Sequence, residues 1–117
     1  MWPTLRPGDR LLVDPKAFSA AAPRPGEIVL ARDPEMVGRR ILKRVAAVGA
    51  SRGPDGTELP AGSVFLLGDD AEVSRDSRAF GPVARTELLG KAWYRYLPSE
   101  RRGPLEPAVS AVEGQSP

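Results

Sequence analysis

Near the middle of the chain, the stretch Val64-Phe65-Leu66-Leu67 runs directly into Gly68-Asp69-Asp70. Four consecutive apolar residues that end at a Gly-Asp turn signal predict a short, buried β-strand. The polar residues that follow predict a loop at the end of a rigid strand, which is where functional side chains are often found.

Four further segments on either side predict strands, because each is rich in apolar residues and is bounded by Pro, Gly or Asp. They are residues 9–14, 27–32, 39–48 and 88–97. The apolar spacing in 39–48 also suits a short helix, and the Ala-rich segment 16–22 predicts one helical turn. The 13 Pro and 12 Gly residues argue against a helical bundle, because they favour turns between short strands.

Together these segments predict an all-β fold, a small, curled, β-barrel-like domain over residues 1–97. Residues 98–117 contain few large apolar side chains, so they predict a disordered tail. The 117 residues suffice for one core. No apolar stretch approaches the roughly 20 residues of a membrane-spanning helix, and no signal peptide is apparent.

The composition excludes several kinds of chemistry, because the chain contains no Cys and no His. A thiolate nucleophile, a Ser-His-Asp triad and a Cys/His zinc site are therefore ruled out. The formal net charge of +2 does not indicate a nucleic-acid partner. The pairs Arg39-Arg40 and Arg101-Arg102 are typical of a solvated surface.

Lys43 and Arg44 lie among Ile41, Leu42 and Val45, so a strand here can hold one of the two cations against an apolar surface. A desolvated lysine has a lowered pKa and can act as a neutral general base near pH 7. An arginine cannot, because its pKa stays above about 12. The alternative is that both cations are solvated on an edge strand.

A second candidate cluster follows the central strand. In an extended segment, Ser74, Asp76 and Arg78 lie on the same face. An Asp/Arg pair with a hydroxyl behind the end of a strand can hold a catalytic base or its loop in place. The alternative is an exposed polar loop with an Asx-type turn.

Four motifs occur in a characteristic order over residues 1–97. They are M-x-P-T-L-x-x-G-D-x-L-L-V from Met1, G-x-I-V from Gly26, K-R-V from Lys43, and V-F-L-L-G-D-D…S-x-D-S-R-x-F-G-x-V from Val64. With this order and spacing the chain resembles the type I signal peptidase family, which are Ser/Lys-dyad serine endopeptidases. Its compactness is similar to that of the mitochondrial inner-membrane peptidases and of the small proteases that mature nickel-containing superoxide dismutase.

The resemblance implies a role for each matching residue. Lys43 matches the general base of the family, and the nucleophilic Ser directly precedes the Met of the first motif. The remaining matches are Ser74, Asp76 and Arg78 in the supporting catalytic loop, Gly68 and Asp69 in the Gly-Asp turn, and Met1, Pro3 and Thr4 in the substrate-side loop.

The chain departs from the family pattern in three places. The Ser would lie one residue before Met1, which indicates a start codon assigned too late. Asp70 stands where the family usually has Asn. Only 24 residues separate Lys43 from Gly68, which leaves no room for the second subdomain of larger members. Thr4 as a replacement nucleophile is disfavoured, because it follows Pro3 in the turn of the family motif.

The function implied by the resemblance is cleavage of a pre-protein or leader segment with small residues at positions −1 and −3. The family implies a membrane-associated enzyme with an extracytoplasmic active site, or a cytoplasmic one for a small maturation protease, and no metal or organic cofactor. Two alternatives stay open. One is a catalytically inactive β-domain of the same fold that binds extended peptides. The other is a self-cleaving repressor peptidase, which the segment from Gly68 to Arg78 fits poorly.

Overall fold

The computed structural model describes residues 4–6, 8–69 and 75–105. In this part the chain forms a seven-stranded antiparallel sheet with the order β1-β6-β2-β3-β4-β5, and β7 also pairs with β6. The elements in chain order are β1 (Arg10–Asp14), α1 (Ala17–Ala20), β2 (Ile28–Arg32), β3 (Arg40–Val48), β4 (Ser63–Leu67), α2 (Ser77–Phe80), β5 (Val83–Ala84), the 3-10 turn η1 (Arg85–Glu87), β6 (Leu88–Leu97), the 3-10 turn η2 (Ser99–Arg101) and β7 (Gly103–Pro104).

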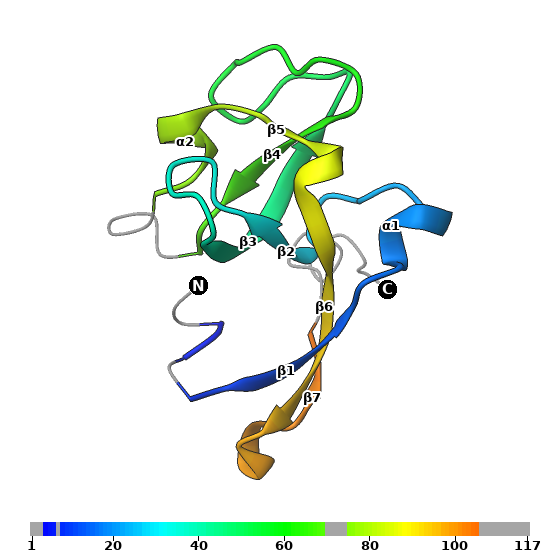
Figure 1. Ribbon diagram of the computed structural model, residues 1–117, viewed down its shortest axis with the longest axis vertical. Helices are drawn as coiled ribbons and strands as arrows, with labels where there is room; N and C mark the ends of the chain where they lie inside the picture. The colour runs from blue at the N-terminus through cyan, green and yellow to red at the C-terminus, as the bar shows by residue number, and fades with distance from the viewer. Residues whose placement is uncertain (1–3, 7, 70–74, 106–117) are drawn as a thin grey trace.

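The long strand β6 organises the sheet. In Figure 1 it runs through the molecule, with β2 to β5 beside its upper part and β1 and β7 beside its lower part. The sheet twists strongly but does not close, because β1 and β5 are two separate edges. The all-β prediction is thus confirmed, as a curled open sheet. The segment 39–48 is a strand, as the first of its two interpretations predicts.

The core explains why the central apolar run is continuous. β4 is buried along four of its five residues. Val64 and Leu66 pack on one side with Val29 and Val45, while Phe65 packs on the other side in a separate cluster with Leu59. A strand that is covered on both faces needs apolar residues at successive positions rather than at alternate ones.

The described structure extends beyond the predicted domain end at residue 97. The turn η2 folds back, and β7 pairs with Tyr94 and Arg95 of β6. Leu105 then packs against the apolar cluster of Leu5, Ile28 and Ala92, and its amide donates to the Trp93 carbonyl at 3.0 Å. Residues 98–105 are therefore ordered, because they complete the lower part of the sheet, and residues 106–117 lie outside the described residues.

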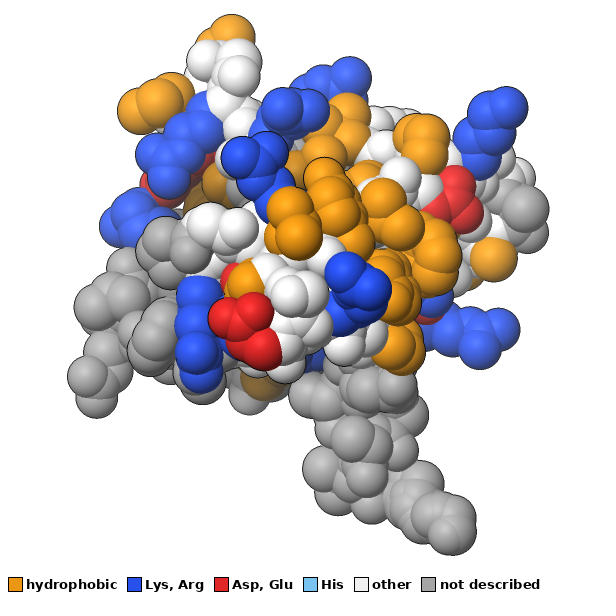
Figure 2. Space-filling model, turned by 90° about the horizontal axis from the view of Figure 1, so that it is seen from below, with side chains coloured by type: hydrophobic (Ala, Val, Ile, Leu, Met, Phe, Trp, Pro, Cys, Tyr) orange, Lys and Arg blue, Asp and Glu red, His pale blue; other side chains and the backbone are white. Residues whose placement is uncertain are grey.

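Part of the apolar surface on β1 and β6 is left uncovered. Its exposed large hydrophobic side chains are Leu12, Trp93, Tyr96 and Leu97. Figure 2, which views the molecule from below, shows hydrophobic side chains gathered into a patch with Lys and Arg side chains around it. Among the described helices, none has the length and apolar character needed to cross a membrane.

Candidate active site

Lys43 lies in the middle of β3, opposite Val29 of β2, and only 9% of the residue is exposed. β3 is an inner strand of the sheet, since β2 and β4 flank it. The alternative of a solvated edge-strand cation is therefore wrong for Lys43. The neighbouring Arg44 projects to the other face of the strand, where it pairs with Asp69.

The surroundings of Lys43 favour its neutral form. Burial is the main cause that lowers its pKa from the usual 10.5, and it outweighs the opposing effect of the Asp76 charge. The Arg39 charge lowers the pKa further. Within the described residues, the Lys43 ammonium has no hydrogen-bond or ion-pair partner that would hold a proton on it. A lysine in this state can accept a proton from a substrate or from a nucleophile.

Lys43 lines a pocket of about 420 Å³, and most of the residues that line this pocket are charged. Its other lining residues are Asp33, Glu35, Arg39, Ile41, Arg75 and Phe80. Arg75 holds Glu35 through two hydrogen bonds of 2.8 and 2.5 Å, which join the loop after β2 to the segment before α2. The pocket is therefore framed by two segments that are distant in sequence, and Lys43 is part of its lining.

Of these lining residues, sequence reasoning proposed only Lys43 as functional. Asp33 and Glu35 follow β2, which pairs with β3, so the hairpin connection was the one available signal that they lie beside Lys43. Arg75 carried no such signal, because its partner Glu35 lies 40 positions away.

The Gly-Asp turn after β4 ties three segments together. Asp69 accepts two hydrogen bonds from Arg44, from Nε at 3.0 Å and from Nη2 at 2.9 Å, and a third from the Thr4 hydroxyl. Burial alone would raise the pKa of Asp69, but these hydrogen bonds outweigh it and hold the pKa below 3.8. Because the Thr4 hydroxyl donates to a carboxylate, its position favours a role in shaping the loop.

Asp76 and Arg78 form an ion pair, but not in the extended geometry that the sequence predicts. Asp76 is the N-cap of α2, so its carboxylate accepts from the backbone N–H of Arg78 as well as from the Arg78 guanidinium. It also accepts from the backbone N–H of Gly68 at 2.9 Å. A helical turn replaces the extended segment because the Asp76 side chain caps it. Ser77, which the sequence analysis did not single out, is buried, and its hydroxyl accepts from the Leu66 N–H at 2.8 Å.

Three residues proposed from the sequence, Met1, Pro3 and Ser74, lie outside the described residues, as does Asp70. Among the described candidates, Thr4 bonds to Asp69, and Asp76 bonds to Gly68 and Arg78, so two hydrogen-bonded groups meet at the turn after β4. Lys43 belongs to neither group, but it lies close enough to Asp76 for the Asp76 charge to oppose the lowering of its pKa.

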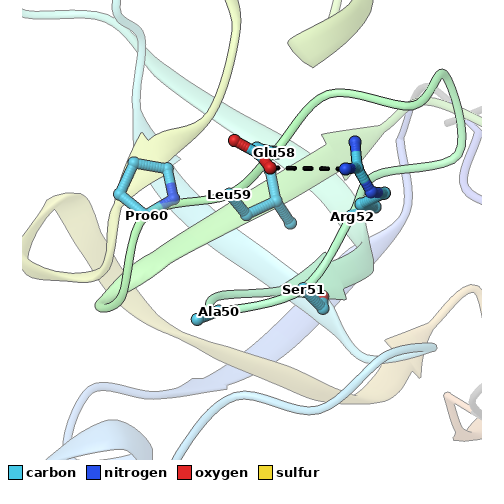
Figure 3. A pocket seen from close by; sticks show the side chains of 6 residues that line it. All are labelled: Ala50, Ser51, Arg52, Glu58, Leu59 and Pro60. Carbon is cyan, nitrogen blue, oxygen red and sulfur yellow. Dashed lines mark hydrogen bonds and ion pairs between the residues drawn. The ribbon is translucent and has the colours of Figure 1, made fainter.

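A second pocket, of about 480 Å³, lies at the β3–β4 connection and is lined by Ala50, Ser51, Arg52, Glu58, Leu59 and Pro60 (Figure 3). Arg52 and Glu58 form an exposed ion pair of 3.3 Å at this pocket. The hydroxyl of Ser51 donates to the Val48 carbonyl. This pocket contains no buried titratable group, so the Lys43 pocket is the better candidate for an active site.

Comparison with known proteins agrees with the motifs. Residues 49–97 match the sequence model of the family described as signal peptidase, peptidase S26. The chain is 35% identical to the mitochondrial ATP-independent inner membrane protease subunit 1b of Arabidopsis thaliana, over 92% of this chain and 70% of that protein. It is 33% identical to the mitochondrial inner membrane protease subunit 1 of Xenopus tropicalis, over 91% and 69%. It is 30% identical to the probable signal peptidase I-1 of Synechocystis, over 90% and 70%. The chain therefore belongs to the signal peptidase family.

The lowered pKa of Lys43 leads to a testable expectation. The chain has three lysines, so each can be followed by mass spectrometry after labelling with an amine-selective anhydride. We expect the labelling of Lys43, scaled to its own plateau, to reach half-maximum at a lower pH in the folded protein than in urea. Exposed Lys16 is labelled in the same sample and controls for the reagent. Coinciding folded and unfolded midpoints for Lys43 would contradict the assigned burial effect.

Proposed function

We propose that this chain carries the catalytic domain of a serine endopeptidase that cleaves a pre-protein or leader segment with a Ser/Lys dyad. Membership of the signal peptidase family supports the peptidase class. The single observation that carries the assignment of the base is the burial of Lys43 at a pocket, without a partner for its ammonium in the described part of the chain. In this proposal the nucleophilic Ser directly precedes Met1 in the natural protein.

The chemistry follows from a neutral Lys43. Its Nζ takes the proton from the Ser hydroxyl, and the Ser oxygen attacks the scissile carbonyl. Backbone N–H groups near the Ser stabilise the negative charge on the carbonyl oxygen. Protonated Lys43 then gives its proton to the leaving amine, and an acyl-enzyme remains. A water molecule, deprotonated by Lys43, attacks the acyl group, and the Ser oxygen recovers a proton as the product acid leaves.

The proposed supporting roles follow from the contacts. Asp76 and Arg78 hold the start of α2 against Gly68, and Asp69 links Thr4 to Arg44, the residue next to the base. The substrate is an extended segment with small residues at −1 and −3, as the family implies. The names of the mitochondrial relatives favour a membrane-associated enzyme, and no cofactor takes part in the proposed steps.

The proposal is tested by the N-terminal sequence and intact mass of the protein purified from its native cells. We expect a product extended upstream, with Ser directly before Met1. The recombinant extended chain should then cleave a peptide containing Ala-x-Ala, whereas a chain that starts at Met1 should not. A native product that starts at Met1 and binds extended peptides without cleaving them would overturn the proposal in favour of an inactive binding domain.

A further inference from the structure

Two arginines from the C-terminal part of the described chain converge on the loop before β1. Arg95 lies on β6, and Arg101 lies in η2. Both donate to the backbone carbonyl of Thr4, Arg95 from Nη2 at 2.6 Å and Arg101 from Nη2 at 3.2 Å. A single carbonyl held by two charged donors is fixed more firmly than one held by a neutral N–H group.

The same arginines also share the carboxylate of Asp9. Arg101 Nη1 lies 2.7 Å from Asp9 Oδ1, and Arg95 Nε lies 3.3 Å from Asp9 Oδ2. The Asp9 side chain is only 5% exposed, and its Oδ2 also accepts from the backbone N–H of Arg6 at 3.0 Å. The Asp9 N–H in turn donates to the Arg6 carbonyl at 3.0 Å, which closes the turn. One buried carboxylate therefore holds the turn and both arginines together.

The Arg101 side chain forms the hydrogen bonds and the ion pair that join η2 to this loop in the described residues. Residues of both segments line a pocket of about 350 Å³, among them Arg6, Asp9, Pro98 and Arg101. The Arg101 side chain lines this pocket and is 20% exposed. Truncating Arg101 would leave the loop and η2 without that contact, while Leu5 stays packed against Ile28 and Ala92.

The loop that the two arginines hold is connected to the candidate site through Thr4. Thr4 is held at its carbonyl by Arg95 and Arg101, and at its hydroxyl by Asp69, which pairs with Arg44 beside the base. Thr4, the described residue of the proposed substrate-side loop, is therefore held by the turn after β4, by β6 and by η2. Motion in this loop would move any group attached at its start relative to Lys43.

We propose that Arg95 and Arg101 are positioning residues, which clamp the loop of residues 4–9 and thereby set the nucleophile against Lys43. This inference rests on the proposed function. It also assigns a role to residues 98–101, which follow the segment that matches the family model. Arg95 also donates from Nη1 to the Arg101 carbonyl at 3.3 Å, which links β6 to η2. The other polar contacts of the two side chains in the described part of the chain go to Thr4 and Asp9, so the arginines act through the position of the loop.

Hydrogen exchange of the chain of 117 residues tests the clamp without any cleavage assay. We expect Arg101→Ala to speed exchange in the peptide that contains the Arg6 and Asp9 amides by about 10-fold or more, because these amides close the clamped turn. Amides of β4 should be unchanged, which excludes global unfolding. The matched control is Arg102→Ala, because Arg102 is an exposed neighbour whose side chain has no hydrogen bond or ion pair in the described part of the chain. Equal exchange in both variants would overturn the clamp.

Kinetics of the Ser-extended enzyme test the positioning role. We expect Arg101→Ala to lower kcat by about 10-fold or more with KM little changed, since a displaced nucleophile affects the chemical step more than binding. Arg101→Lys should restore part of the loss, because it keeps one charged donor. Faster exchange with unchanged kcat would overturn the positioning role. If the extended wild type cleaves nothing, the proposed function fails, and hydrogen exchange alone still decides whether the clamp exists.

Discussion

Replacing Lys43 with Met in the Ser-extended enzyme is expected to lower kcat/KM for an Ala-x-Ala peptide by about 10³-fold or more, because the Ser loses its only assigned base. Met fills a similar volume without a charge, so the strand keeps its packing. Lys43→Arg is expected to be equally inactive, because a guanidinium stays protonated. The measurement is the initial rate of peptide cleavage by each purified variant.

Stability gives this prediction its control. Burial lowers the pKa of Lys43 in the folded state, so the unfolded chain binds this proton more tightly, and the lysine costs stability at neutral pH. Lys43→Met should therefore unfold at no lower urea concentration than the parent, which separates lost chemistry from lost fold. Lys16→Ala, at an exposed lysine, should keep full activity. If the Lys43→Met variant still cleaves the peptide, the proposed Ser/Lys dyad is wrong.

The strands could be predicted from the sequence because each has a local pattern bounded by turn residues. Leu88–Leu97 matches the observed β6, and the buried run Val64–Leu67 differs from β4 by one residue. The short strands Val83–Ala84 and Gly103–Pro104 could not be predicted, because two residues carry no periodicity. They form only where a neighbouring strand offers free backbone groups, which depends on tertiary structure.

In the candidate site too, features with a local sequence pattern could be predicted, and features that depend on tertiary structure could not. Local sequence indicated that a strand could hold Lys43 or Arg44 against an apolar surface, but whether the lysine is buried depended on the strands that flank β3. The Asp76–Arg78 pair was anticipated, yet its geometry depends on a helical turn that four residues are too short to signal. Contacts across the chain, such as that of Arg75 with Glu35, have no local pattern at all.

Asp76→Ala is expected to cause the largest loss of stability among the site variants. The side chain is 1% exposed and accepts hydrogen bonds from the Gly68 and Arg78 amides and from the Arg78 guanidinium. Its removal deletes an N-cap, worth about 1 kcal/mol, and leaves a buried donor unsatisfied at a cost of about 1–3 kcal/mol. We therefore expect the free energy of unfolding at pH 7 to fall by about 2–4 kcal/mol in urea denaturation. The matched variant Arg78→Ala should lose less, because its side chain is 40% exposed and both amide contacts stay.

The pH dependence of this loss identifies its cause. Burial alone would raise the pKa of Asp76, but its hydrogen bonds from Arg78 and Gly68 outweigh that effect and hold the pKa below 3.8. A carboxylate with a lowered folded pKa stabilises the protein above its unfolded pKa, and this contribution is lost as the pH falls through the folded pKa. The difference between the parent and Asp76→Ala should be full at pH 7 and should shrink below about pH 4. If the difference in the free energy of unfolding stays constant from pH 7 to pH 3, the packing of the Asp76 side chain, rather than its charged hydrogen bonds, holds Gly68 and the turn in place.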